Sequence, residues 1–369
     1  MRKSAHELAR QGRTLGGAVH FERPVFECPT CRHASAPLDG EVGLASGENL
    51  SRGIVRKVAW NAARHSFGDA VADLKEMSGL ELSAAEVARV AHAEGARLDQ
   101  AQRQAEAPFL APVSPEQPAP EPLCSPERLV LEGDGTVVLT RPGEENKVVY
   151  CGAGFALEDR QAKDGSERPF LLNRRHTASA TSLEDFGERL RALAFQMGLR
   201  RAREVAFIAD GAPGLWAMAA ALLPEGTVFI QDFWHVVEHL AALAHALYGE
   251  AGAPGVLERW RVALKESRLH EILADLEEQH KRRRGSARQK LEQEIHYLES
   301  GRARMDYARY AAEGWPIGSG AVEGECKHLV KERFCVTGAH WRRARIGDVL
   351  ALRLAIANGE WEAAWINSN

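Results

Sequence analysis

Apolar residues have helical periodicity between residues 51 and 98. They recur at intervals of three and four, and the segment SFGDAVADLKEMSG stops at Gly79. The next segment, LSAAEVARVAHAEGARL, opens with Ser83 and Glu86 at the spacing of a capping box. Two helices joined by the short turn GLEL are typical of a helix-turn-helix, although many such pairs do not contact DNA. We therefore predict a helical, helix-turn-helix-like DNA-binding region over 51–105.

This periodicity is lost on both sides of the helical region. Residues 1–50 contain short β-type runs and one close pair of cysteines, Cys28 and Cys31. Residues 106–127 are rich in proline and have no periodicity, which predicts a semi-rigid extended linker. We expect this linker to separate two domains.

After the linker, apolar segments of the strand type replace the helical periodicity. RLVLEGDGTVVLT and KVVYCGAGFALED predict strands, and SLEDFGERLRALAFQMG predicts a helix with Ser182 at its N-cap. EVAFIAD and TVFIQD predict two further strands, each followed by a helical segment. Strand-helix-strand order with short connections favours parallel neighbouring strands with helices on the faces of the sheet. The expected fold class is therefore α/β, a mixed sheet with flanking helices.

Long amphipathic helices interrupt this alternation. Residues 236–312 are nearly all helical and contain no predicted strand. The strands lie before them in 128–235, and further helices with aromatic residues follow in 313–369. We expect 236–312 to be an all-helical insertion into one α/β domain made of 128–235 and 313–369.

Composition narrows the class of protein. The 369 residues are 45% hydrophobic and 27% charged, and no apolar run is long enough to span a membrane. The first residues lack the apolar segment of a secretory signal. Six scattered cysteines fit a reducing cytoplasm, and we interpret Cys151 and Cys326 as buried or incidental thiols. A cytoplasmic protein without a membrane partner is expected.

Charge is unevenly distributed. A net charge of −4 excludes a uniformly basic coat for nucleic acid, yet basic residues concentrate near the C-terminus. Such a face can bind a polyanion because phosphate contacts act at short range in salt, although solvated helix faces give the same pattern. The predicted DNA contacts are Lys327, Lys331, Arg333, Trp341, Arg342, Arg343 and Arg345.

Three carboxylates occupy positions that can carry chemistry. Asp134 lies in the first β-type run, Asp210 ends a predicted strand, and Glu323 opens a helix after the insertion. Carboxylates that converge from different elements can hold two Mg²⁺ or Mn²⁺ ions for phosphoryl transfer. Each also has a structural explanation, because Asp-Gly favours a turn, an aspartate can cap a helix and acids suit helix N-termini. The spacing alone leaves both interpretations open.

Longer motifs add a resemblance to a known family. The runs FIADGAPGLWAMAAALLPEGTVFIQDFWHVVEHLAALAHALYG, GSGAVEGECKHLVKERFCVTGAHW and NGEWEAAW resemble the ISKra-type family of bacterial insertion-sequence transposases. The resemblance implies a ribonuclease H-like core with an Asp-Asp-Glu metal triad, here Asp134, Asp210 and Glu323, and a helical insertion before the Glu. Related transposases carry an acid or cysteine followed by a histidine, matched here by Asp232 and His235. These two would lie beside the metal site and orient a catalytic carboxylate or contact a DNA phosphate.

Two patterns are reminiscent of zinc sites. His235, Glu238 and His239 have the spacing of a zinc peptidase site, but no third ligand can be singled out downstream, which favours a chance match on a helix. Cys28 and Cys31 form half of a zinc ribbon, so residues 1–50 are interpreted as a partial zinc-ribbon-like segment. Members of the resembling family often carry another cysteine pair upstream. We hypothesise a late start or a truncated element.

Taken together, these features predict a DNA transposase of an insertion sequence. Water activated at the metal site would cleave the transposon ends, and the freed 3′-hydroxyl would attack target DNA by in-line phosphoryl transfer. The expected partners are double-stranded DNA, at the transposon ends and the target, and further copies of the chain in a homo-oligomer in the bacterial nucleoid. A catalytically decayed transposase that only binds DNA is the alternative, and a zinc metallopeptidase is a remote one.

Overall fold

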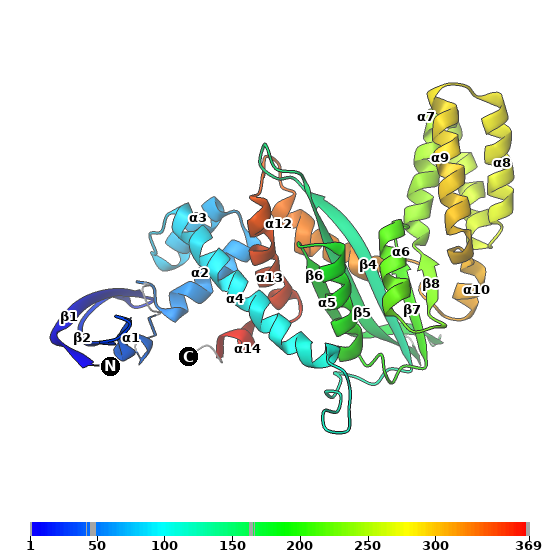
Figure 1. Ribbon diagram of the computed structural model, residues 1–369. Coiled ribbons are helices and arrows are strands. Elements are labelled where there is room, and N and C mark those ends of the chain that lie inside the picture. Colours follow the sequence, from blue (N-terminus) through cyan, green and yellow to red (C-terminus); the bar gives the residue numbers. More distant parts are fainter. Residues whose placement is uncertain (1, 42, 45–48, 162–164, 166, 367–369) are drawn as a thin grey trace. The chain divides into compact units, whose positions relative to one another are not determined.

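The structure is a computed structural model that describes residues 2–41, 43–44, 49–161, 165 and 167–366. The chain divides into two compact units, whose segments can be followed by colour in Figure 1. Unit 1 consists of Met1–Gln104, Leu139–Asn146 and Glu332–Asn369, and unit 2 of Ala105–Val138 and Lys147–Lys331. Within the described ranges, no helix is both long and apolar enough to cross a membrane.

An antiparallel hairpin opens unit 1. Its two long strands pair with each other, and the second also pairs with a very short third strand. Asp39 in the following helix is buried and forms ion pairs with Arg10 and Arg23 of the hairpin, which ties the helix to the strands. The elements are β1 (Arg2–Thr14), β2 (Gly17–Glu27), β3 (Ala34–Ser35) and α1 (Pro37–Glu41).

Helices from both ends of the chain form the core of unit 1. Ile54, Leu74 and Val87 from the first part pack with Leu352 and Trp361 from the last part, and burial of such side chains stabilises the unit. The helices are α2 (Arg52–Arg64), α3 (Phe67–Ser78), α4 (Ala84–Leu110), α12 (Glu332–Phe334), α13 (Ile346–Ala357) and α14 (Trp361–Ile366), with a 3₁₀ turn η3 (Arg343–Arg345).

Helix α4 begins as the sequence predicts and ends later. Ser83 and Glu86 form the predicted capping box, in which the Ser83 N–H donates to Glu86 at 2.9 Å and the Glu86 N–H donates to Ser83 at 3.2 Å. The helix then continues past residue 106 to Leu110, with Pro108 inside it. The predicted extended linker therefore starts too early, because the strong helix formers of AQRQAEA carry the helix onward.

Unit 2 is built on a five-stranded mixed sheet with the order β6-β5-β4-β7-β8. β5 runs antiparallel to both β4 and β6, whereas β7 runs parallel to β4 and to β8. The strands are β4 (Arg128–Val138), β5 (Lys147–Gln161), β6 (Glu167–Ser179), β7 (Glu204–Ala209) and β8 (Val228–Gln231).

Helices cover both faces of this sheet (Figure 1). On one face, α5 (Leu183–Gln196) and α6 (Pro213–Leu222) pack on Leu129, Leu131 and Phe207 in an apolar core. On the other face, α11 (Gly320–Glu325) and the π-helical turn η2 (Cys326–Lys331) contact β4, and α11 also contacts β5. Because side chains alternate along a strand, odd-numbered residues of β4 face α5 and even-numbered ones face α11.

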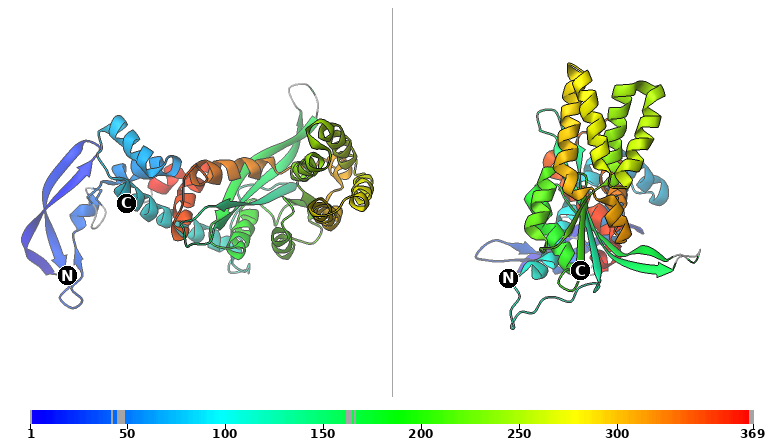
Figure 2. Two further views of the ribbon diagram at one scale, coloured as in Figure 1. Left: turned by 90° about the horizontal axis from the view of Figure 1, so that it is seen from above. Right: turned by 90° about the vertical axis from the view of Figure 1, so that its right-hand side faces the viewer.

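Between β8 and α11 the chain is helical apart from short connections. Three of these helices contact one another and stand side by side in Figure 2. Tyr307 and Tyr310, from the last helix, donate their hydroxyls to the carbonyls of Gln231 at 2.9 Å and Phe229 at 3.2 Å, which occupies acceptors of β8. The elements are α7 (Phe233–Lys265, kinked at Gly249), α8 (Leu269–Arg282), α9 (Ser286–Gly301), η1 (Arg302–Arg304) and α10 (Tyr307–Ala312).

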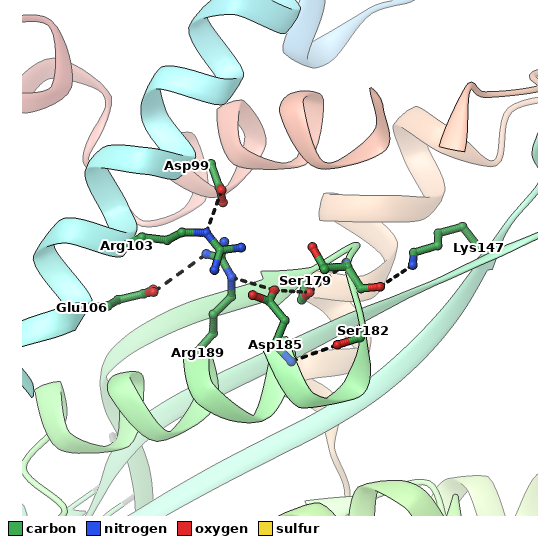
Figure 3. A network of polar contacts seen from close by, with 9 residues as sticks. Asp99, Arg103, Glu106, Lys147, Ser179, Ser182, Asp185 and Arg189 are labelled. Atoms are coloured by element: carbon green, nitrogen blue, oxygen red, sulfur yellow. Dashed lines mark hydrogen bonds and ion pairs between the residues drawn. The ribbon is translucent and has the colours of Figure 1, made fainter. Parts of the chain in front are cut away.

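A buried polar network anchors α5 within unit 2 (Figure 3). The Arg189 guanidinium lies 3.2 Å from the Asp185 carboxylate and 3.9 Å from that of Glu106, and little of these side chains is exposed. Asp185 also accepts a hydrogen bond from the Ser179 hydroxyl at 2.5 Å. A buried charge needs this degree of pairing, because an unpaired one is strongly destabilising. Ser182 begins the helix as predicted and accepts the Asp185 N–H at 3.2 Å.

Candidate active site

Carboxylates gather on one face of β4. The run Glu132-Gly133-Asp134-Gly135 alternates acids with glycines, so both acids point to the α11 face. Gly133 leaves room on the opposite face, where a Cβ would lie 3.1 Å from the Phe207 ring, a tight contact. The even-numbered side of β4, with the groups of β7, β8 and α11 around it, is called the carboxylate face below.

Asp134 lies within the strand and not in a turn. It pairs with Cys151 of β5, and the connection between the two strands comes only after Val138. The Asp-Gly turn signal is therefore overridden by pairing along the sheet. Burial raises the pKa of Asp134, and the neighbouring Asp210 carboxylate raises it further, while a hydrogen bond from the buried Cys326 thiol lowers it. Two carboxylates that repel each other in this way favour a shared cation.

Asp210 follows directly after β7, beside Asp134. Gly133 and Ala209 are paired in the parallel register of β4 and β7, so the residues after them reach the same end of the sheet. The Asp210 carboxylate accepts the Ala212 N–H at 3.1 Å. Ala212 itself is the N-cap of α6, so Asp210 is not the helix cap. The Asp210 carboxylate bonds to the turn between β7 and α6 and lies at the edge of the carboxylate face.

Glu323 stands in the first turn of α11, on the same face as Asp134. Its side chain is exposed, and α11 contacts both β4 and β5. Within the described residues, no three His, Cys, Asp or Glu side chains come close enough together to hold a metal ion. The fold thus brings Asp134 and Asp210 together, whereas Glu323 does not complete a metal-binding group with them. Oxygen ligands of this kind fit Mg²⁺ or Mn²⁺.

Glu132 is a site residue that motif matching missed. Its side chain is 1% exposed, and its carboxylate accepts the Val322 N–H of α11 at 2.6 Å. Burial raises the pKa of Glu132 to about 8, although the bond from Val322 lowers it. The detectable signal was an acid inside an otherwise apolar strand, where burial of a charge is expensive without a partner.

Asp232 and His235 occupy the start of α7. Asp232 is buried and caps the helix, because its Oδ1 accepts the His235 N–H at 2.8 Å. Its Oδ2 accepts the Ser319 N–H at 2.5 Å and the Ser319 hydroxyl. Of the two roles considered for Asp232, these contacts favour holding the segment before Glu323 over binding a phosphate. The half-buried His235 has its Nδ1 3.8 Å from the Glu238 carboxylate.

His239 and its neighbours connect the insertion to Asp210. The Nδ1 atom of His239 lies 3.0 Å from the Glu294 carboxylate, whose hydrogen bond raises the pKa of the imidazole. The ring stacks on Tyr297 at a centroid distance of 4.3 Å, and the Tyr297 hydroxyl donates to the Asp210 carbonyl at 3.2 Å. His239 is therefore bound by an ion pair and a ring contact, which gives no support to the peptidase interpretation.

The Cys28 and Cys31 knuckle lies between β2 and β3. The Arg32 N–H donates to the Cys28 carbonyl at 2.9 Å, and hydrogen bonds from the backbone of Cys31 and Thr30 lower the pKa of Cys28. Both thiols are free. In the part of the chain that the structure describes, no third ligand joins them, so the knuckle does not fit a complete structural zinc site.

The predicted DNA contacts fall into exposed and buried groups. Lys327 and Lys331 of η2 are exposed, as are Arg342, Arg343 and Arg345. Arg333 and Trp341 are only 4% and 8% exposed. The Arg333 Nε donates to the Ala62 carbonyl at 3.0 Å, and its guanidinium lies 4.7 Å from the centre of the Trp341 ring. These two side chains therefore lie inside unit 1, where they contact α2 and each other.

A basic cavity of about 840 Å³ lies within unit 1. Its wall includes an alanine-rich side of α4, the 339–345 segment and the loop after β4. Histidines and arginines line it without any aspartate or glutamate, and two of them, Arg89 and Arg141, were not among the predicted contacts. The basic cavity is lined by Arg89, His92, Arg141, Arg333, His340, Arg342 and Arg345, together with Ser66, Phe67, Trp341 and five alanines.

Comparisons with known proteins give little independent information. No family model matches the chain, and no curated protein sequence matches it. Among solved structures, NurA covers 66% of this chain at 16% identity and a TM-score of 0.11, and NurA bound to dAMP and manganese covers 65% at 15% identity and a TM-score of 0.09. The aligned part spans 56% of each NurA chain. Scores this low carry no argument about fold or function.

Proposed function

We propose that the chain is a metal-dependent DNA transposase of the ISKra type with a ribonuclease H-like core. The observation that supports it best is the position of Asp134 and Asp210, which follow the paired residues Gly133 and Ala209 of two neighbouring parallel strands, with the helix of Glu323 on the same face. The sheet order, with three antiparallel strands followed by two parallel ones, also fits such a core. The helical insertion precedes Glu323, where the resemblance places it.

In this proposal, Asp134, Asp210 and Glu323 would hold two divalent cations. When bound, the cations supply a lowered pKa for the attacking water and stabilisation of the leaving oxygen. Asp134 would present its oxygens from within β4 and Asp210 from directly after β7, so the sheet would hold both groups before the substrate arrives. The exposed Glu323 side chain has rotamer freedom on its helix and can turn toward the aspartates.

The basic cavity supports DNA as the proposed substrate. Its arginines and histidines offer many donors to phosphate oxygens, and no lining carboxylate repels a polyanion. The alanine side chains of α4 leave room for a sugar-phosphate strand to come close to the helix. Unit 1 would then bind DNA, and unit 2 would cut it, while recognition of sequence would come from base contacts by α3 and α4.

Asp210→Asn tests the proposed chemistry. We expect the native protein to nick a supercoiled plasmid carrying the DNA that flanks the gene, with Mg²⁺ or Mn²⁺, and the variant to lose this activity. Asp159→Asn is the matched control, because Asp159 lies on β5 of the same unit and its side chain is 52% exposed. Equal nicking by Asp210→Asn and native protein would overturn the assignment. A native protein that binds the plasmid but never cuts it would be a DNA-binding protein alone.

A further inference from the structure

The four residues before Glu323 are tied to the sheet by two buried carboxylates. Asp232, at the end of β8, accepts the Ser319 N–H at 2.5 Å, and Glu132, in the middle of β4, accepts the Val322 N–H at 2.6 Å. Both acids are almost fully buried, at 4% and 1% exposure. The backbone immediately before Glu323 is thus held at two points, by one side chain of β4 and by one that directly follows β8.

Glu132 takes the place of a helix cap. Ser319 is the N-cap residue of α11, yet its side chain makes no capping bond to the helix, because its hydroxyl donates to Asp232. The free N–H groups at the start of a helix need acceptors, and a buried helix start without them is destabilised. The Glu132 carboxylate supplies the acceptor from a strand 190 residues away in sequence.

This contact acts on the residue next to Glu323. α11 is only six residues long, so its direction depends on how its first turn is fixed. Glu132 reaches that turn at Val322, and Asp134, two residues further along β4, lies on the same face. One strand therefore sets both the position of Asp134 and the position from which Glu323 extends.

We propose that Glu132 is a positioning residue, whose hydrogen bond to the start of α11 holds the Glu323 backbone in place opposite Asp134 and Asp210. This inference rests on the proposed function for its effect on DNA cleavage. The bond itself, and its effect on α11, do not depend on that function.

The test compares Glu132→Leu with Glu132→Gln. Leucine removes the acceptor, whereas the glutamine carbonyl still accepts the Val322 N–H. We expect the single-turnover cleavage rate of the plasmid to fall about 10- to 100-fold in Glu132→Leu, with DNA affinity unchanged, because small misplacements of reacting groups are costly. Glu132→Gln should stay within about threefold of native. In a Glu323→Gln background, Glu132→Leu should cause no further loss, because its effect passes through Glu323.

Two further measurements separate positioning from general instability. Glu106→Leu is the matched control, since Glu106 is also a buried carboxylate of unit 2 but pairs with Arg189 on the opposite side of the sheet from α11. It should lower thermal stability without lowering the cleavage rate of the folded protein. Hydrogen exchange at residues 320–323 should be about tenfold faster in Glu132→Leu than in native protein, and close to native in Glu132→Gln.

The outcomes are distinguishable. Absence of cleavage by native protein would overturn the proposed function, and hydrogen exchange would still test the contact between Glu132 and α11. Unchanged exchange at 320–323 in Glu132→Leu would overturn the positioning role. So would a native cleavage rate in Glu132→Leu, an equal loss in Glu132→Gln, or a further loss in the Glu323→Gln background.

Discussion

The buried acids of the carboxylate face in unit 2 lie on or directly after strands, whereas the basic residues around the cavity of unit 1 lie on helices and loops. On the carboxylate face, Glu132 and Asp232 are buried and accept backbone N–H groups at 2.5–2.6 Å. Around the basic cavity, Arg89, Arg141 and Arg342 are exposed side chains. The first arrangement holds the carboxylates through bonds to backbone N–H groups, while the second places long cationic side chains at the surface of unit 1.

The difference between the carboxylate face and the basic cavity corresponds to the difference between catalysing a reaction and binding a polyanion. Chemistry needs groups held in place before the substrate arrives, because reorganisation during reaction costs rate. Binding of a flexible polyanion needs positive charge at short range and tolerates side-chain movement. The comparison teaches that the two tasks can be separated experimentally, since a change in one unit should leave the other task intact.

Asp134→Asn should have the largest effect, on cleavage, and should leave DNA binding intact. Loss of one carboxylate from the pair removes several kcal/mol of stabilisation, so we expect cleavage to fall by about a thousandfold or more. DNA affinity, measured by fluorescence anisotropy, should remain within about twofold. The variant should also melt at a higher temperature, because burial and Asp210 make the native charge unfavourable. Parallel loss of cleavage and affinity would contradict the separation of the two tasks.

His176→Gln should remove a pH dependence of stability in unit 2. His176 lies across the sheet from Glu132, through Ala153 of β5, and burial lowers its pKa to about 4, with Arg174 and Arg175 lowering it further. The unfolded chain takes up a proton near pH 6.5, whereas the folded protein does so only near pH 4, so native stability falls as the pH drops through this window.

The expected size of this effect is about 3 kcal/mol between pH 7 and pH 4, from a pKa difference of about 2.5. Urea unfolding of native protein and His176→Gln at several pH values measures it. As the pH falls, the free energy of unfolding of the native protein should decrease more than that of His176→Gln. Curves that stay parallel would show that His176 is not held in its neutral form.

Gly95→Ala should disturb the helices beside the basic cavity and spare the carboxylate face. A Cβ at Gly95 would lie 2.0 Å from the Asp348 carbonyl oxygen of α13, so α4 must move. We expect a loss of about 1–3 kcal/mol and weaker DNA binding. Gly347→Ala is the control, because a Cβ there meets open space and should stabilise α13 by up to about 1 kcal/mol. Hydrogen exchange should place the loss in α4 and α13, and faster exchange in β4 would contradict the prediction.

Arg342→Ala should have the smallest effect and should act on binding alone. Removal of one phosphate contact should weaken DNA affinity by about three- to tenfold and lower the slope of log affinity against log salt by about one. Arg259→Ala in α7 is matched in charge, because Arg259 is 69% exposed and lies outside the cavity. Equal losses in both variants would mean that net charge alone, and not the cavity, binds DNA.

Local patterns in the sequence predicted four strands of the unit 2 sheet, β4, β5, β7 and β8, but they did not predict β6. Strands expected before Asp210 and Asp232 are present as β7 and β8, and both aspartates stand at strand ends. Ser182 caps its helix as expected. Such features depend on neighbours within a few residues, which is why periodicity and capping rules detect them.

Features set by distant parts of the chain escaped prediction. Glu132 finds its partner 190 residues later, and no local rule links the two. Arg333 and Trp341 belong to a basic run that suggests a surface, yet both are buried through contacts with α2 and with each other. Asp134 carries a turn signal that pairing with β5 overrides. In each case tertiary contacts decide against the local signal.

The discontinuity of unit 1 has a consequence for synthesis of the protein on the ribosome. Ile54 and Val58 of α2 share their core with Leu352 and Trp361, which are made only after the whole of unit 2 has emerged. During that interval the nascent helices carry an uncovered apolar surface, the kind that chaperones bind and that aggregates. A product that stops before α13 would keep this surface exposed permanently, so chaperones and proteases would act on an incomplete chain.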